Sequence, residues 1–321
     1  MINFRYHLVS IIAVFLALGI GIIMGTAVID RAVVDRLERQ QDGLRQDIDD
    51  VRSENARLRT ELNEERDTSQ QLADEGSQRL LDGALNGIPV LVVGIRNVET
   101  KGLEDLLALL TRAQADYRGT LWFTDRFRLD DPDERSDLAE SLGMRADAAG
   151  SALRSAAIDR LSEALRPSTS PGSDPAVDVL PALRDAGFID YDAPEGVPAD
   201  SFATLANGTR VLVVSGLEPP VADRLLMVPF TRGLVAARAD RPPAPVLAVS
   251  GAPALTPDAD TFIGPIRQDG AVGEQLSTVD DIDDFAGRLA SVLALADLGA
   301  GRFGHFGRGP GAQRLLPAPP E

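Results

Sequence analysis

The chain has 321 residues, of which 44% are hydrophobic, no cysteine, and a formal net charge of −17. The apolar content is that of a folded protein and is too high for general disorder. The acidic charge argues against a nucleic-acid partner, whose phosphates are also negative. The lack of cysteine excludes disulfides, thiolate catalysis and cysteine-bound metals.

A long apolar run opens the chain. Residues 8–29 carry no charged side chain, and a helix over them is about 33 Å long, enough to cross a hydrocarbon core of about 30 Å. Arg5 precedes the run, whereas Asp30 and Arg31 after it balance each other. The positive-inside rule therefore keeps the N-terminus in the cytoplasm. We expect residues 1–29 to be a cytoplasmic N-terminus and a single-pass plasma-membrane anchor, with everything beyond them extracytoplasmic.

Two other interpretations of this run fit less well. A cleaved signal peptide has a shorter apolar region of about 7–15 residues and a small-x-small cleavage site, which Gly25-Thr26-Ala27 matches poorly. A buried helix of a soluble protein would need apolar partners on all sides. Gly21 and Gly25, four residues apart, would let two membrane helices approach closely, so we expect them to form a transmembrane packing site.

A heptad repeat predicts a parallel coiled-coil stalk over residues 30–80. Asn55 stands at a core position, where asparagine favours two parallel strands in register. Acids at position g are followed five residues later by arginines at position e, in the pairs Asp47–Arg52, Glu54–Arg59 and Glu61–Arg66. The predicted homodimer interface comprises Val34, Leu37, Leu44, Ile48, Val51, Asn55, Leu58 and Leu62. An unpaired solvated helix, or pairing with a different coiled-coil protein, remains open.

Strands and helices alternate over residues 85–298. Short apolar runs bounded by turn residues predict buried strands at 88–95, 120–123, 211–214 and 246–249. Helical spacing is found near 103–110, 130–142, 152–165, 181–186, 222–237 and 280–298. This alternation predicts a three-layer, mostly parallel α/β domain outside the cytoplasm. Ligands of such domains bind at the carboxyl ends of the strands, here Gly94-Ile95-Arg96-Asn97, Ser215-Gly216 and Ser250-Gly251. A strand that ends in Ser-Gly is more often explained by a tight turn than by a ligand.

The sequence offers no catalytic constellation. The two histidines are His7, beside the apolar run, and His305, near the C-terminus, so no Ser-His-Asp arrangement can be built within the α/β domain. We expect no enzyme, no catalytic residue and no evident cofactor. The acids Asp280, Asp281, Asp283 and Asp284 stand at a helix start, with Ser277, Thr278 and Asp280 as N-cap candidates. Capping explains them better than a cation site, because the turn glycine of a calcium loop is missing. Residues 299–321, rich in glycine and proline, are expected to be a flexible tail.

Three stretches carry a resemblance to a known family. MINFRYHLVSIIAVFLALGIGIIMG at the start, QLSTVDDIDDFAGRLASVLAL late in the chain and GHFG after it resemble the mycobacterial copper transport protein B (MctB) family of actinobacteria, which includes the SteB cell-separation proteins. The resemblance covers essentially the whole chain. It implies a role in copper transport or homeostasis at the cell envelope, and the family name implies an outer-envelope location as the alternative to the plasma membrane.

Two functions therefore stand side by side. The resemblance implies copper, but Cu(I) favours Cys and Met ligands, and the chain has no cysteine and four methionines, so the metal-binding residues are unknown. The anchor and stalk instead favour a non-enzymatic dimeric scaffold. The resemblance to the SteB proteins implies that such a scaffold regulates a second envelope protein in peptidoglycan remodelling and cell separation.

Overall fold

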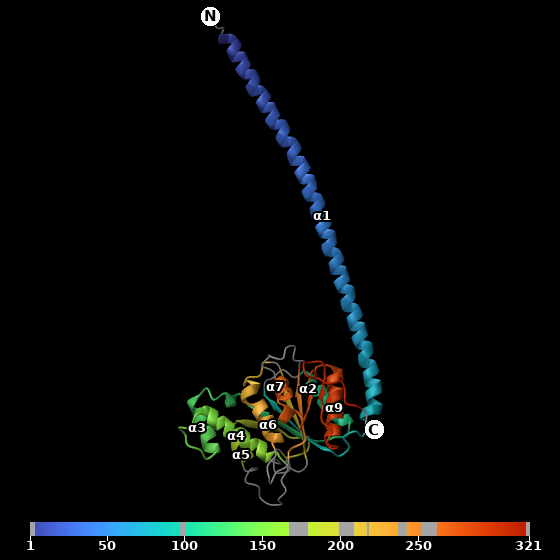
Figure 1. Cartoon of the computed structure of the whole chain (residues 1–321), viewed down its shortest axis with the longest axis vertical. Helices are drawn as coiled ribbons and strands as arrows, with labels where there is room; N and C mark the ends of the chain where they lie inside the picture. Colours follow the sequence, from blue (N-terminus) through green and yellow to red (C-terminus); the bar gives the residue numbers. More distant parts are fainter. Residues whose placement is uncertain are drawn as a thin grey trace, which may run out of the picture. The chain divides into compact units, whose positions relative to one another are not determined.

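The computed structural model describes residues 4–96, 101–166, 179–198, 209–216, 218–236, 243–251 and 262–318. The chain divides into two compact units, Met1–Gln71 and Leu72–Glu321. The first consists of helix, and the second is a mixed α/β domain, called the head below (Figure 1).

Helix α1 (Phe4–Leu81) is continuous over 78 residues. Its segment from Tyr6 to Gly25 is long and apolar enough to cross a membrane, which confirms an N-terminal apolar helix. Space surrounds Gly21 and Gly25, since a Cβ added at either would meet no atom within 4 Å. Their packing role stays a prediction.

The heptad segment of α1 is helical throughout, as its apolar spacing requires. Three of its core-position apolar side chains that the structure describes are exposed: Leu44 by 62%, Val51 by 60% and Ile48 by 43%. The side chains of Val34, Leu37 and Leu62 lie outside the described residues. The coiled coil therefore stays a prediction.

The described residues of the head form a seven-stranded sheet in the order β3-β2-β1-β4-β5-β6-β7. The strands are β1 (Pro89–Ile95), β2 (Asp116–Phe123), β3 (Ile189–Asp192), β4 (Arg210–Ser215), β5 (Val246–Ser250), β6 (Ser277–Val279) and β7 (His305–Phe306). Neighbouring strands run parallel, except that β3 is antiparallel to β2. The largely parallel sheet predicted from the apolar runs is confirmed.

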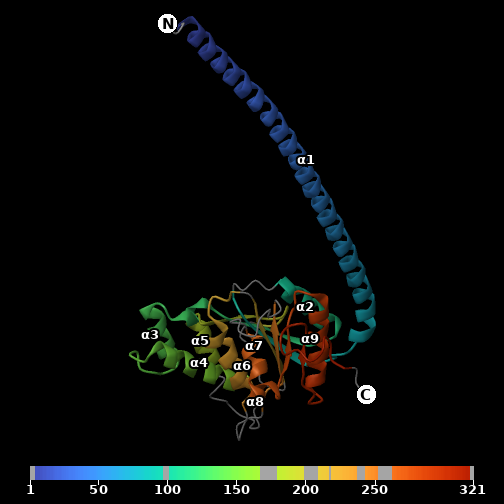
Figure 2. The ribbon, with the colours of Figure 1, turned by 45° about the horizontal axis from the view of Figure 1, so that its top comes forward.

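Helices cover both faces of the sheet. Strand β1 shows why, because Val90 and Val92 pack into one core while Leu91 and Val93 pack into the other. One face is covered by α2 (Lys101–Arg112) and α9 (Phe285–Leu298), which contact each other. The opposite core includes α3 (Pro132–Ser141), α4 (Gly150–Ala164), α5 (Val179–Asp185), α6 (Met227–Val235) and α7 (Ile263–Gln268), followed by the short α8 (Gly270–Gly273) (Figure 2). The expected three layers are present.

Three strands of the sheet were not predicted from the sequence. Strand β3 has four residues, β6 reads Ser-Thr-Val and β7 has two residues, so none shows an apolar run. The helix expected from 280 begins at Phe285 instead, because Asp281 has a positive φ of 65° that a right-handed helix does not allow. The helix expected over 222–237 is a short 3-10 turn (Asp223–Leu225) followed by α6, with Pro229 in the first turn, where proline is tolerated.

The C-terminal segment also needs a correction. We name residues 299–318 the C-terminal strap. It supplies β7, which pairs with β6, and Gly307 N donates to Arg314 O at 2.9 Å. The expectation of a flexible tail over 299–321 was therefore wrong for these residues, because composition did not reveal their partners in the head.

Candidate functional site

A ligand of this fold class is expected at the carboxyl edge of the sheet, where the strand order reverses. That point lies between β1 and β4, because the chain adds β2 on one side of β1 and later β4 on the other. Arg96 follows β1 and Gly216 follows β4 here. Residues 97–100 and 217, which continue these two loops, lie outside the described residues, and so does the predicted Asn97.

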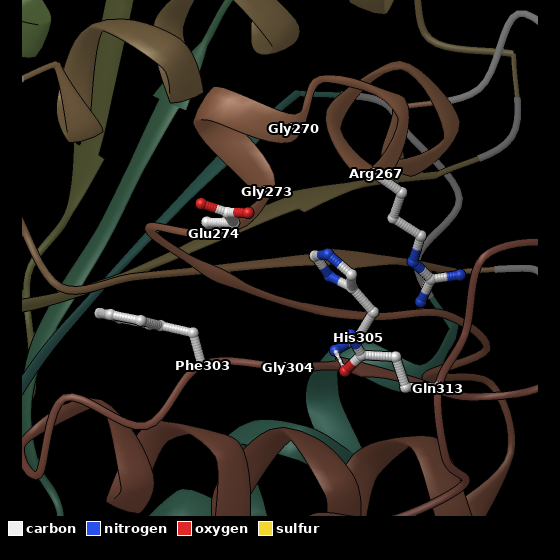
Figure 3. Close-up of a pocket in the computed structure, with 8 residues that line it drawn as sticks. All are labelled: Arg267, Gly270, Gly273, Glu274, Phe303, Gly304, His305 and Gln313. Carbon is white, nitrogen blue, oxygen red and sulfur yellow. Dashed lines mark hydrogen bonds between the residues drawn. The ribbon is translucent and has the colours of Figure 1, made fainter.

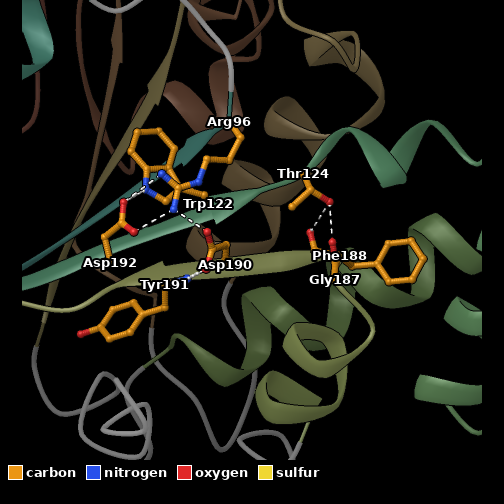
Figure 4. Close-up of polar contacts among 8 residues, drawn as sticks. All are labelled: Arg96, Trp122, Thr124, Gly187, Phe188, Asp190, Tyr191 and Asp192. Atoms are coloured by element: carbon orange, nitrogen blue, oxygen red, sulfur yellow. Dashed lines mark hydrogen bonds and ion pairs between the residues drawn. The ribbon is translucent and has the colours of Figure 1, made fainter. Parts of the chain in front are cut away.

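Arg96 is held by aromatic and acidic neighbours (Figure 4). Its guanidinium donates to both carboxylate oxygens of Asp192, at 2.9 and 2.7 Å, and to Asp190 at 2.5 Å. It also lies 4.9 Å from the ring centre of Trp122, whose Nε1 donates to Asp192 at 2.6 Å. The hydrogen bond from Arg96 is the main cause that lowers the pKa of Asp192. These contacts use the charge of Arg96 to hold the antiparallel edge strand β3.

The turns at the other two predicted strand ends are also held by hydrogen bonds within the head. Ser215 Oγ donates to Asp223 Oδ1 at 2.7 Å, and both residues are buried. Ser215 therefore fixes the turn after β4. Gly251 lies against Gly216 and the Asp283 carboxylate, and Gly251 N donates to Ser215 O at 3.0 Å. Within the described residues these turns form a packed structure.

The acidic residues between β6 and α9 form hydrogen bonds that stabilise the fold. Asp284 is the N-cap of α9 and accepts from Phe285 N. Asp283 accepts from Gly102 N at 3.0 Å, which ties the loop to α2. The expected capping is thus found, but at Asp284. The candidates Ser277 and Thr278 lie in β6 instead.

Asp280 forms a buried ion pair with Arg267 of α7. The two groups lie 2.8 Å apart, and their side chains are 0% and 3% exposed. Asp280 also accepts from Arg308 N at 2.7 Å and Gly309 N at 3.1 Å. Arg267 donates to Phe306 O at 2.7 Å and Pro310 O at 3.1 Å. The pair therefore binds four backbone groups of the C-terminal strap, which compensates for burying the two charges.

A pocket of 470 Å³ lies between the strap and the α7–α8 region (Figure 3). Its lining comprises Arg267, Gly270, Gly273, Glu274, Phe303, Gly304, His305 and Gln313. Figure 3 shows the His305 imidazole reaching from the strap toward Gly273, with Glu274 and Phe303 on the other side of the ring from Arg267. Half of the lining belongs to the strap, so the pocket is complete only while the strap is docked.

The protonation of His305 follows from its hydrogen bonds. Arg267 Nε can only donate, so Thr278 Oγ1 accepts this bond at 2.8 Å. Thr278 is buried, and its hydroxyl has no other acceptor among the described residues, so its proton is directed at His305 Nδ1, 3.0 Å away. This satisfies all three groups and leaves the imidazole proton on Nε2. Burial, and then the Arg267 charge, lower the pKa of His305, so the ring is neutral at neutral pH.

No group of three or more His, Cys, Asp and Glu side chains among the described residues is placed to hold a metal ion. His7 belongs to α1 and His305 to the head. The imidazole of His305 and the carboxylate of Glu274 are the only two side chains of these types that line the pocket. A single imidazole and a single carboxylate are fewer ligands than protein copper and zinc sites use.

Sequence reasoning missed the residues that organise the head. Arg96 was named for its place after a strand, but its partners Asp190 and Asp192 lie on a strand that the pattern did not reveal. His305 was assigned to a flexible tail. Arg267 gave no signal, because its partner Asp280 belongs to another element and looked like a cap. The two nearby stretches 275–295 and 304–307, which carried the family resemblance, were the available clue.

Together these features define a class: an apolar N-terminal helix that could span a membrane, continued by a long helix and a three-layer α/β head. The chain belongs to the family described as "Copper transport outer membrane protein, MctB", whose model matches residues 1–317. It is 29% identical to the copper transporter MctB of Mycobacterium tuberculosis (strain H37Rv), over 98% of this chain and 99% of the relative. It is 25% identical to the copper transporter MctB of Mycobacterium leprae, over the same shares of the two chains.

Proposed function

We propose that this chain is a single-pass, membrane-anchored envelope protein with a non-enzymatic role in copper transport or homeostasis. Copper is its cargo, and the head lies outside the cytoplasm. The observation that carries the proposal is the family match over residues 1–317, which includes the apolar helix as well as the head. A relative similar over 98% of this chain is named a copper transporter.

The described residues contain one helix apolar enough to cross a membrane, and one such helix cannot line a pathway for an ion by itself. We therefore infer that the chain works as an assembly, first with a second copy and then with another envelope protein. The arrangement of α1 supports this inference, because its span from Tyr6 to Gly25 runs without a break into the heptad segment. A helix anchored at one end in the membrane can pair with another copy only in parallel.

The stalk pairing has a direct test. In the predicted register Asn55 of two copies would face each other, whereas Thr60 would point away from the seam. In the otherwise cysteine-free chain, Asn55→Cys should give a cross-linked dimer on mild oxidation, and the matched variant Thr60→Cys should not. Equal cross-linking of both variants, or none at Asn55→Cys, would contradict the parallel homodimer.

The copper role is tested by deleting the gene and measuring copper tolerance and cell-associated copper. We expect lower tolerance in the deletion strain, restored by the full chain but not by a chain that lacks residues 1–29. The purified full chain is titrated with copper in parallel. Unchanged tolerance together with no stoichiometric copper binding would overturn the proposal.

A second function, a scaffold for cell separation, is favoured by one observation. The stripe formed by Leu44, Ile48, Val51 and Leu58 is exposed on α1, and an exposed apolar stripe serves protein association better than metal chemistry. Cross-linking in intact cells followed by capture of the chain should then recover one specific envelope protein. A deletion strain whose daughter cells separate normally would count against this function.

A further inference from the structure

The pocket beside His305 presents polar groups that the fold itself does not use. The guanidinium of Arg267 donates its hydrogen bonds to Asp280, Thr278 and the strap. Within the described residues, by contrast, the exposed Glu274 carboxylate forms no ion pair. The side-chain oxygen of Gln313 accepts from His305 N at 3.2 Å, which leaves its amide N–H₂ group to face a ligand.

The unpaired charge of the pocket is negative. Arg267 and Asp280 cancel each other, so Glu274 decides the electrostatic preference of the lining. Phe303, which is 44% exposed, contributes an aromatic ring to the same lining. A carboxylate together with an aromatic face suits a protonated amine, which the carboxylate binds by charge and the ring by its negative face. Glu274 and Phe303 together disfavour a ligand that is purely anionic.

The other side of the pocket offers hydrogen-bond donors. The bonds that orient His305 leave its proton on Nε2, and Gln313 contributes its amide hydrogens. Both groups are neutral donors, and both suit the oxygens of a carboxylate or a carbonyl. The pocket therefore has an end that prefers a cation and an end that prefers an acceptor.

We propose that this pocket binds a small zwitterion, either a free amino acid or a dipeptide. Its ammonium group lies against Glu274 and Phe303, and its carboxylate accepts from His305 and Gln313. A volume of 470 Å³ is in the range of small-molecule sites. The proposal goes beyond the copper role and does not depend on it. Since the strap supplies half of the lining, ligand binding also stabilises the docked strap.

The experiment uses the two histidines of the chain as probes. The full chain is labelled with isotopic histidine, kept in detergent micelles at about pH 7.5, where the imidazole is neutral, and titrated with L-alanine or L-alanyl-L-alanine. His305→Gln assigns the two imidazole signals. We expect a saturable shift of the His305 signal alone, with a dissociation constant of about 0.1–10 mM. Tighter binding of L-alanine identifies an amino-acid site, and tighter binding of the dipeptide a peptide site.

The variants separate the two ends of the pocket. Glu274→Gln should weaken binding at least about tenfold, while Glu195→Gln, an equal charge change at another exposed position of the head, should leave it unchanged. N-acetyl-L-alanine lacks the ammonium group and L-alaninamide lacks the carboxylate, so both should bind more weakly than L-alanine. Unchanged Trp122 fluorescence shows that each variant is folded. The proposal is overturned by the absence of a saturable His305 shift up to about 50 mM, or by equal binding of N-acetyl-L-alanine.

Discussion

At the scale of single residues, His305 makes the stability of the head depend on pH. Burial and the Arg267 charge lower its pKa from 6.5, so the unfolded chain binds a proton first as the pH falls. The contribution of the neutral His305 ring to the free energy of unfolding is therefore complete above about pH 6.5. It decreases as the pH falls toward the pKa of the folded state. We expect His305→Gln to lose less stability than the unaltered chain between about pH 7 and about pH 5. Urea unfolding followed by the fluorescence of Trp122, the one tryptophan of the chain, measures this difference.

Other groups titrate in both proteins and cancel in the comparison. The pKa of Asp192 is lowered by Arg96, so its contribution is lost only below its usual range. Burial raises the pKa of Asp281, and this acts equally in the variant. His7→Gln removes an imidazole from α1 instead of the head and should behave like the unaltered chain. A pH dependence that is unchanged in His305→Gln would show that this ring does not carry the effect.

At the scale of elements, the C-terminal strap depends on one ion pair. Asp280→Asn leaves the Arg267 guanidinium buried without its counter-charge, which costs about 3–5 kcal/mol, and weakens the acceptors for Arg308 N and Gly309 N. We expect a lower free energy of unfolding and faster tryptic cleavage within the strap, for example after Arg308. Asp147→Asn is the matched control, because its ion pair with Arg145 is exposed at 69% and 85% and contributes little.

Gly307 tests the same strap without removing either charge. Its φ of +121° is unfavourable for other residues, and an added Cβ would lie 2.1 Å from Asp280 Oδ1. Gly307→Ala should therefore also expose the strap to trypsin. Gly143→Ala is the control for a positive φ in open space. Strap cleavage at the unaltered rate in both Gly307→Ala and Asp280→Asn would show that the pair does not hold the strap.

The same element shows how far the sequence could predict this fold. Strand β1 could be predicted from its apolar run, and the alternation of strands and helices was predicted from similar runs. Strand β6 could not be found in this way, because Thr278 and Asp280 are polar groups whose burial depends on Arg267. The strap looked flexible because its backbone partners come from a different part of the chain. The pocket was hidden for the same reason, since its two walls meet only in the folded head.

At the scale of the whole molecule, the proposed orientation of α1 places the head outside the cytoplasm, and this placement can be tested directly. The absence of cysteine allows single-cysteine variants to be labelled without background. Asp49→Cys in α1 and Asp147→Cys in the head replace exposed side chains, at 77% and 69% exposure. We expect a membrane-impermeant maleimide to label both in intact cells, and to label His7→Cys only after the plasma membrane is opened.

The same experiment also distinguishes a plasma-membrane anchor from a cleaved signal peptide and from an outer-membrane location, because each predicts a different result. A cleaved signal peptide would release a chain that lacks His7→Cys altogether, which the mass of the purified protein reveals. An outer-membrane location, as in the description of the family, would place the chain in a different membrane fraction. Labelling of His7→Cys in intact cells would overturn the proposed orientation, since the charge of Arg5 would then not have kept the N-terminus inside. Only an intact chain in the plasma membrane with a protected His7→Cys fits a head held outside by a single helix.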